Sequence, residues 1–532
     1  MPGAPRRAAP PRWYLAIMAV CLSALTAAQP ARSQDPPPAF PPPDPRFGAV
    51  ETYHTPELAD AARVGWTRII FYWSELEKDG PGSWNWFHAP LDRIDREIEG
   101  GREVVGLLKH TPAFATDGIP GAGVPRGLYL PVDNPDNLWA GFVRRVVSAY
   151  QGRVQRWIIW NEPDIPLNAF GAQWAGTAAD YYRLVKVAYL AAHEVDPDVK
   201  IHLGGLTYWH NPNYLREFLI AASRDPSADE NGYYFDVVSV HIYFRPETTL
   251  DIVGSIRHTL ADFSLDKPIW INETNAPPYD DPAQPWQEPV FPVTQDMQAS
   301  FLLQEFALAL AVGCERVSVY KWIDEPPPQP GFEPYGLLRG DRTPRPAYNA
   351  FYVITAHYAG ATDALLLERP ELLQVILLRG EHTTRVLWAR TPDGLAVTVP
   401  ALAESVLAVD QTGREVVLSA QAGRYQLELP GAPCETQSEC LMGGPPLVLV
   451  EQATLDLAGW TEIGATVTGI SGQGLTAPIL TASPLPERVS HPAGLVGASR
   501  YALSHPLIVL SLSVALIAAG GIALAFWVSR RE

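Results

Sequence analysis

The chain has 532 residues, 47% of them hydrophobic, and a formal charge of −18 at neutral pH, with 58 acidic side chains against 40 basic ones. Such a length and apolar content suffice for more than one folded domain, which excludes a chain that is disordered throughout. The acidic balance supplies no basic surface that could neutralise phosphates, so a nucleic acid is not an expected partner.

The N-terminus has the composition of a secretory signal. Arginines precede an apolar run over residues 13–28, and small residues follow it, so we predict a signal peptide over residues 1–33. The alternative is an uncleaved anchor, although the run is shorter than the ~20 residues that a membrane span needs. Residues 34–46 are rich in proline, which predicts an extended, semi-rigid linker.

Residues 47–354 alternate short β-branched or aromatic runs with longer amphipathic stretches, a pattern typical of repeated βα units around a parallel sheet. Eight such units favour a (β/α)8 barrel over a doubly wound sheet, which would need a glycine-rich phosphate loop that the sequence lacks. The predicted strands are residues 47–54, 67–73, 103–110, 155–162, 199–206, 236–243, 268–275 and 316–323.

Residues 355–455 show short alternating strands broken by turn residues, which predicts a β-sandwich domain after the barrel. Within this domain Cys434 and Cys440 enclose a short loop, and in an oxidising compartment we expect a disulfide there rather than a metal site. Cys314 lies in an apolar run and is expected to be a buried thiol. No cysteine is therefore expected to be catalytic.

The C-terminal part is expected to tether the protein to a membrane. Residues 456–505 are rich in Gly, Thr, Ser, Ala and Pro, which predicts a stalk with some strand content. Residues 507–528 carry no charge and are followed by Arg530 and Arg531. This pattern predicts one transmembrane helix and a cytoplasmic tail over residues 529–532, with the folded domains outside the cell.

Two of the predicted strands carry a glutamate in their C-terminal part, Glu162 as the last residue of the fourth strand and Glu273 near the end of the seventh. In a (β/α)8 barrel the active site lies at the C-terminal ends of the strands, where these two strands face each other. Hydrolysis of a glycosidic bond with retention needs one carboxylic acid to protonate the leaving oxygen and one carboxylate to attack the anomeric carbon. We therefore assign Glu162 as the general acid/base and Glu273 as the nucleophile. A single such glutamate would be better explained as an ordinary rim residue.

The segments around these glutamates resemble the clan A glycoside hydrolases. The resemblance rests on Trp160-Asn161-Glu162-Pro163 in the fourth strand and on Glu273 at the end of the seventh. The segment that begins WSELE at Trp73 and the segment over residues 335–352 are further similar to families 39 and 5. The resemblance covers about residues 47–352 and implies a (β/α)8 barrel and a retaining mechanism.

The same resemblance implies a set of substrate-binding residues. Asn161 would donate or accept a hydrogen bond with the sugar hydroxyl next to the anomeric carbon, a contact that strengthens in the transition state. Trp322 would form a platform under the sugar, and Tyr243 would lie near the nucleophile. The other residues implied to line this subsite are His241, His110 and Trp73. Core packing is the alternative for the tryptophans, and a structural role is the alternative for the histidines.

Two features depart from the pattern of these families. Thr274 follows the predicted nucleophile, where family members often have Trp or Phe. An arginine that many family 5 relatives carry at the end of the second strand is not found at that position. The resemblance therefore defines the clan more firmly than the family.

A carbohydrate is the expected partner, held in a cleft between long loops that follow the third, seventh and eighth strands. The sequence contains no HExxH motif, and the neighbouring Asp280 and Asp281 are a weak calcium signal, so we predict no metal and no cofactor. A transglycosidase with the same two glutamates and a non-catalytic carbohydrate-binding surface protein remain alternatives, and the oligomeric state is open. Candidate stacking residues in the loops are Trp286, Phe291, Phe332 and Tyr335.

Overall fold

The computed structural model describes residues 42–286, 289–325, 333–436, 439–455 and 463–470. The predicted signal peptide, most of the linker, most of the stalk and the predicted span over residues 507–528 lie outside the described residues. Of the helices that are described, none combines the length and the apolar composition needed to cross a bilayer.

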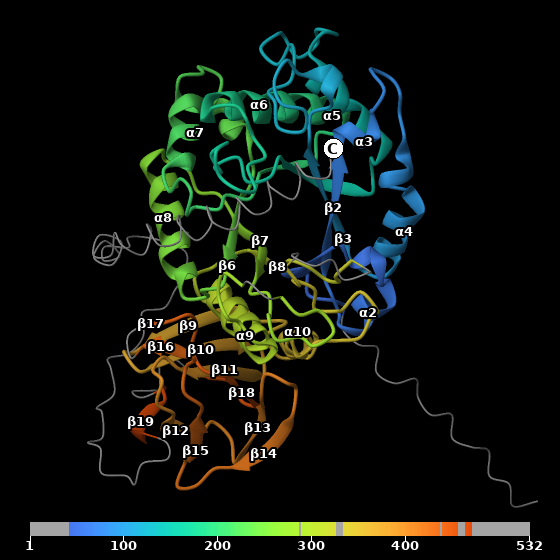
Figure 1. The fold of residues 1–532 in the computed structure, drawn as a ribbon. Coiled ribbons are helices and arrows are strands. Elements are labelled where there is room, and N and C mark those ends of the chain that lie inside the picture. Colours follow the sequence, from blue (N-terminus) through green and yellow to red (C-terminus); the bar gives the residue numbers. More distant parts are fainter. Residues whose placement is uncertain (1–41, 287–288, 326–332, 437–438, 456–462, 471–532) are drawn as a thin grey trace, which may run out of the picture. The chain divides into compact units, whose positions relative to one another are not determined.

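Eight parallel strands form a closed barrel (Figure 1). Their hydrogen-bonded order is β5-β4-β3-β2-β1-β8-β7-β6, and bridges from His202 to Val237 and from Leu206 to Val240 join β5 to β6. The predicted barrel is therefore confirmed. The strands are β1 (Phe47–Val50), β2 (Trp66–Tyr72), β3 (Glu103–Lys109), β4 (Val154–Ile159), β5 (Lys200–Leu203), β6 (Val238–Tyr243), β7 (Ile269–Asn275) and β8 (Arg316–Val319).

Helices surround the ring of strands (Figure 1). Local signals begin the longer ones: Thr177 and Asp180 form a capping box at the start of α6, and the hydroxyl of Thr294 accepts a hydrogen bond from the amide of Met297 at the start of α9. The α-helices are α2 (Pro56–Ala61), α3 (Trp73–Leu76), α4 (Leu91–Glu99), α5 (Leu138–Ala149), α6 (Ala178–Val195), α7 (Tyr214–Ser223), α8 (Thr248–Asp262), α9 (Gln295–Ala311) and α10 (Pro346–His357). Short 3-10 helices are η1 (Thr52–His54), η2 (Trp86–His88), η3 (Ala113–Ala115) and η4 (Asp229–Tyr234).

The barrel interior is filled by side chains and forms a floor under the C-terminal ends of the strands. The rings of Trp66 on β2 and Trp270 on β7 lie 5.1 Å apart at their centroids, and Val105 and Leu107 of β3 belong to the same buried cluster. Because side chains alternate along a strand, the second residue beyond each of these positions also faces inward. This alternation directs Arg68 on β2 and Lys109 on β3 into the barrel.

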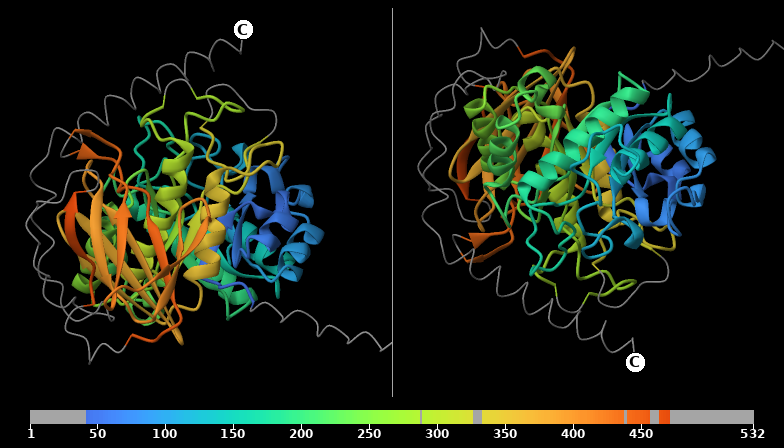
Figure 2. Two further views of the ribbon diagram at one scale, coloured as in Figure 1. Left: turned by 90° about the horizontal axis from the view of Figure 1, so that it is seen from below. Right: turned by 90° about the horizontal axis from the view of Figure 1, so that it is seen from above.

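Two antiparallel sheets follow the barrel and share one apolar cluster, the arrangement expected of a β-sandwich. Their strands (orange to red in Figure 2) lie beside α9, which contacts β9, β10 and β11. The six-stranded sheet has the order β14-β13-β18-β11-β10-β9 and the three-stranded sheet the order β15-β12-β19. The strands are β9 (Asp363–Glu368), β10 (Leu372–Arg379), β11 (His382–Ala389), β12 (Leu395–Pro400), β13 (Ser405–Val409), β14 (Glu415–Ser419), β15 (Arg424–Leu429), β18 (Leu447–Glu451) and β19 (Thr466–Ile470).

One of these strands lies beyond the predicted C-terminal limit of the β-sandwich domain. Strand β19 lies in the region predicted as stalk, yet it pairs with β12 along the three-stranded sheet. Ala465 and Val467 are buried in the cluster that the two sheets share. The folded part of the chain therefore extends beyond residue 455, because β19 forms the outer strand of the three-stranded sheet beside β12.

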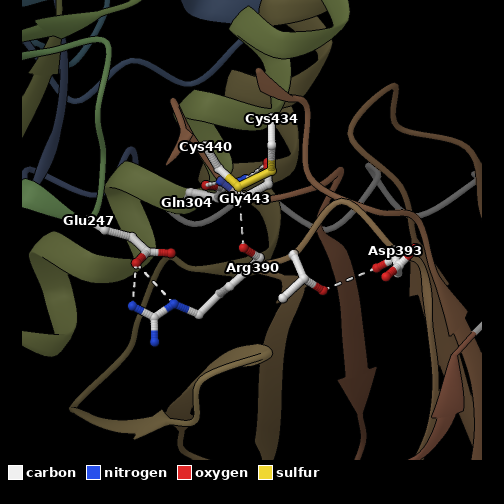
Figure 3. The surroundings of a disulfide bond; sticks show 8 residues. Glu247, Gln304, Arg390, Asp393, Cys434, Cys440 and Gly443 are labelled. Atoms are coloured by element: carbon white, nitrogen blue, oxygen red, sulfur yellow. Dashed lines mark hydrogen bonds and ion pairs between the residues drawn. A yellow bond between two sulfur atoms is a disulfide. The ribbon is translucent and has the colours of Figure 1, made fainter. Parts of the chain in front are cut away.

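A disulfide joins Cys434 to Cys440 (Figure 3). It links the two strands of a small hairpin, β16 (Cys434–Thr436) and β17 (Glu439–Cys440). The hairpin lies where the sheets meet the barrel helices: the side chain of Gln304 on α9 donates to the carbonyl of Gly443 at 3.0 Å and accepts from its amide at 3.1 Å. The disulfide therefore constrains a loop at this joint and takes no part in the carboxylate site.

Candidate active site

The two predicted catalytic glutamates lie close together in the barrel mouth. Glu273 belongs to β7, and Glu162 follows β4 after a turn in which Trp160 and Glu162 have φ angles of 70° and 46°. One oxygen of each carboxylate and one ring nitrogen of His241 all lie within 4.8 Å of one another. Retaining glycosidases hold the two carboxyl groups about 5–5.5 Å apart and inverting ones roughly 6.5–9.5 Å apart, so an approach of two carboxylate oxygens to within 4.8 Å favours the retaining arrangement.

Arg68 is the principal partner of Glu273. Its guanidinium forms an ion pair with Oε1 of Glu273, and both side chains are almost completely buried. The hydroxyl of Tyr243 donates to the other oxygen, Oε2, at 2.6 Å. Burial alone favours the neutral acid, but the charge of Arg68, together with His241 and the Tyr243 hydroxyl, outweighs burial and lowers the pKa of Glu273. Glu273 is therefore held as a carboxylate, the form that a nucleophile needs.

Arg68 corrects the sequence analysis, which found no arginine at the end of the second strand. The arginine is instead the third residue of β2. The arginine reaches Glu273 from below because it faces inward between Trp66 and Ile70, and its long side chain spans the distance to the rim. The signal was present in the sequence, since a charged residue at an inward position of a buried strand requires a charged partner.

His241 links the two carboxylates. Its Nδ1 lies 2.8 Å from Oε1 of Glu162 and 3.4 Å from Oε2 of Glu273. Burial opposes a charge on this ring, but the charge of Glu273 and the contact with Glu162 together raise its pKa. Gly205 makes room for the ring, because a Cβ at that position would lie 1.9 Å from Nε2 of His241. The glycine therefore explains why the chain after β5 can pass so close to the site.

Asn161 and a group of tyrosines complete the rim around the carboxylates. Asn161 is 8% exposed, and its Oδ1 is buried without a hydrogen-bond partner among the described residues. The ring of Tyr335 lies 5.5 Å from that of Tyr243 and 5.4 Å from that of Tyr320. Tyr320, which directly follows β8, was missed in the sequence analysis. Alternation along β8 from Ser318 would have indicated it.

Trp322 and Trp73 do not lie where the sequence analysis expected them. Trp322 is fully buried, its Nε1 donates to the hydroxyl of Thr55 at 2.8 Å, and its ring packs against Phe351 of α10. Trp73 is also fully buried and stacks on Phe142 of α5. Both belong to the core between strands and helices, so neither can offer a ring face to a sugar. For Trp73 the reason is alternation, because the inward residue at the end of β2 is Tyr72.

His110 and the loop aromatics predicted to stack on a sugar lie in different surroundings. Nδ1 of His110 lies 2.6 Å from the hydroxyl of Ser74, and burial and the charge of Lys109 lower the pKa of the imidazole. It therefore lies at the rim with a structural partner. Trp286 is 9% exposed, and Phe291 packs on Phe244, while Phe332 lies outside the described residues.

Asp281, which the sequence analysis considered as a weak calcium signal, has a structural role. It is fully buried and forms ion pairs with Arg339 at 2.8 Å and Arg345 at 2.7 Å. Among the described residues, the group able to offer three ligand atoms to a metal consists of Glu162, His241 and Glu273. Arg68 already supplies positive charge to this group, which makes it a poor host for a second cation.

The chain matches no model of a protein family. Among curated proteins, a β-xylosidase from Caldicellulosiruptor saccharolyticus is 26% identical over 233 residues, which make up 40% of this chain and 43% of that protein. The chain thus spans less than half the length of the curated relative that it matches.

Solved structures with the same fold include several glycoside hydrolases. A family 39 glycoside hydrolase from Bacteroides cellulosilyticus has a TM-score of 0.57 at 18% identity, covering 76% of this chain and 81% of that one. A family 30 endoxylanase from Clostridium papyrosolvens has a TM-score of 0.51 at 13% identity, covering 77% and 97%. The resemblance to clan A glycoside hydrolases is therefore confirmed at the level of the fold.

Arg68→Met tests the electrostatics of this site. The lowered pKa keeps Glu273 ionised and stabilises the fold above the usual glutamate range, a contribution that is lost as the pH falls through that lowered pKa. We expect the variant to shift the acidic limb of the kcat/KM profile upward by about 1 pH unit or more. Arg153→Met, which removes an arginine paired with Asp95 outside the site, should leave the profile unchanged. An active Arg68→Met variant with an unmoved acidic limb would contradict this account.

Proposed function

We propose that this chain is a retaining glycoside hydrolase in which Glu162 is the general acid/base and Glu273 the nucleophile. The observation that carries the proposal is the approach of one oxygen from each carboxylate to within 4.8 Å. Two carboxylates at this spacing suit a double displacement. In that reaction the nucleophilic carboxylate attacks the sugar directly, so no water molecule has to fit between the carboxylate and the anomeric carbon. The fold shared with families 39 and 30 supports the same reaction class.

In the first step, Glu273 attacks the anomeric carbon while the bond from that carbon to the leaving oxygen breaks. Glu162 gives its proton to the leaving oxygen, and a covalent bond joins the sugar to Glu273. In the second step, Glu162 accepts a proton from water, the water oxygen attacks the anomeric carbon, and the bond to Glu273 breaks. Each step leaves Glu162 in the protonation state that the next one needs.

The groups around each glutamate support the assignment of one as nucleophile and the other as acid/base. Arg68 and Tyr243 contact opposite oxygens of Glu273, so they orient the nucleophile and keep it ionised. The pKa of Tyr243 is raised well above its usual value by burial and by the charge of Glu273, so its hydroxyl remains a donor. Within the described part of the chain no arginine pairs with Glu162, and Glu162 is more exposed, with 17% of its side chain accessible against 6% for Glu273. This asymmetry supports assigning proton transfer to Glu162.

For the substrate, we propose a β-linked glycan of the xylan type. The curated relative is a β-xylosidase and one structural neighbour is an endoxylanase, so aryl β-xylosides and xylo-oligosaccharides are the first compounds to test. The position of Asn161 directly before Glu162, as in the motif that resembles clan A glycoside hydrolases, supports recognition of a sugar hydroxyl beside the reacting carbon.

Glu162→Gln tests the acid/base assignment. The variant cannot protonate a leaving group, so we expect kcat/KM for xylo-oligosaccharides, whose leaving groups are poor, to fall by about 100-fold or more. Activated aryl glycosides do not need protonation and should lose far less. The measurement is kcat/KM on both substrate types at several pH values.

The matched control is Glu75→Gln, which changes a half-exposed glutamate paired with His88 and should leave both activities unchanged. Equal losses on the two substrate types in Glu162→Gln would remove the assigned role. Absence of hydrolysis by the unmodified chain on any glycoside would contradict the proposed function as a whole.

We also propose that the folded domains lie outside the cell, tethered by the apolar segment at residues 507–528. The charge-free segment followed by two arginines supports this location, and the disulfide between Cys434 and Cys440 suits an oxidising compartment. Protease added to intact cells should release a large active fragment. Protection of the chain until the cells are lysed would contradict the proposal.

A further inference from the structure

Lys109 is a charged residue in the barrel mouth to which the mechanism above gives no role. It is the last residue of β3 and continues the inward face of Val105 and Leu107. Only 9% of its surface is exposed, and its Nζ lies 5.6 Å from the ring centre of Tyr72 on the neighbouring strand. A nearly buried ammonium requires a polar partner, and that partner identifies its role.

The partner is Gln173, which in turn contacts Glu162. The ammonium of Lys109 donates to Oε1 of Gln173, and Nε2 of Gln173 donates to Oε2 of Glu162 at 3.3 Å. An amide accepts only through its oxygen and donates only through its nitrogen. The ammonium therefore fixes the orientation of the amide, and the amide must present its NH2 group to the carboxylate.

The backbone of Gln173 is held independently of this side chain. Nε1 of Trp160 donates to the carbonyl of Gln173 at 2.8 Å, and Trp160 precedes Glu162 by two residues. The loop that carries the amide is thus anchored to the segment that carries the carboxylate. Side-chain replacements at Gln173 leave this anchor in place.

Charged and titratable groups face this pair from several strands. Burial and the charge of Arg68 lower the pKa of Lys109 to about 8, while Glu162 and Glu273 act in the opposite direction. Oε1 of Glu162 contacts Nδ1 of His241 at 2.8 Å. Among the described residues, Asp164, Tyr243 and Tyr335 also interact electrostatically with Glu162, and His110 with Lys109.

We propose that Lys109 and Gln173 are positioning residues for Glu162, which orient its carboxyl group and favour the carboxylate that forms when Glu162 gives its proton to the leaving group. The inference rests on the proposed function. In this arrangement His241 binds one oxygen of Glu162 and the amide binds the other, so the carboxyl group has one preferred orientation. The ammonium acts on Glu162 through the amide, and the alkaline limb of the pH profile reads out this effect because Glu162 must be protonated for the first step.

Lys109→Met tests the proposal through the pH profile. Loss of the ammonium should favour the protonated form of Glu162, so the alkaline limb of kcat/KM should move up by about half to one pH unit. Lys109→Arg keeps the charge and should stay closer to the unmodified protein. Lys200→Met is the matched control, since it removes a lysine at the start of β5, at the opposite end of the barrel, and should not move either limb.

Gln173→Glu provides a second, independent variant. Its carboxylate would pair with Lys109 and repel the charge on Glu162, so the alkaline limb should again move up. A purely structural Lys109 would change stability and leave the limb in place. The proposal is overturned if the alkaline limb is unmoved in both folded variants, or if neither variant folds. Failure of the proposed function is distinguishable, because the unmodified chain would then show no glycoside hydrolysis at all.

Discussion

The site depends on one buried ion pair, that between Arg68 and Glu273. A carboxylate with 6% of its side chain exposed would ordinarily take up a proton, because a low-dielectric environment penalises charge. The guanidinium reverses that preference: Arg68 lies on the inward face of β2, and Glu273 lies at the irregularity in strand register between β7 and its neighbours. The barrel floor of Trp66 and Trp270 in turn shields the pair from water, which strengthens the interaction.

From this pair the polar contacts extend across the mouth in one connected series. Glu273 contacts His241, His241 contacts Glu162, and Glu162 contacts Gln173. The carboxylate deepest in the series has a full positive charge beside it, whereas the carboxylate nearer solvent is held by a histidine and an amide. Two identical side chains thereby acquire different chemistry from their surroundings, which is what a double displacement demands.

The fold and the carboxylate pair were predictable from the sequence, because the apolar runs that lead to Glu162 and Glu273 follow a periodicity that reports local structure. The binding residues were less predictable, since a motif says which residue type is present but not which way it faces. Trp73 and Trp322 were expected in the site and lie in the core, where indole N–H donors bond Glu77 and Thr55. Arg68 and Tyr320 were missed, although inward alternation along β2 and β8 indicates both. The contact of Gln173 with Glu162 depends on how a long loop folds back, which no periodicity reports.

The most direct test is to ask whether Glu273 forms a bond to a sugar. An activated 2-deoxy-2-fluoro β-xyloside slows release of a covalent intermediate, so incubation followed by peptide mass spectrometry identifies the attacking residue. The account predicts time-dependent inactivation and a single labelled peptide in which Glu273 carries the sugar. Turnover of glycosides without any labelling, or a label on a residue other than Glu273, would contradict it.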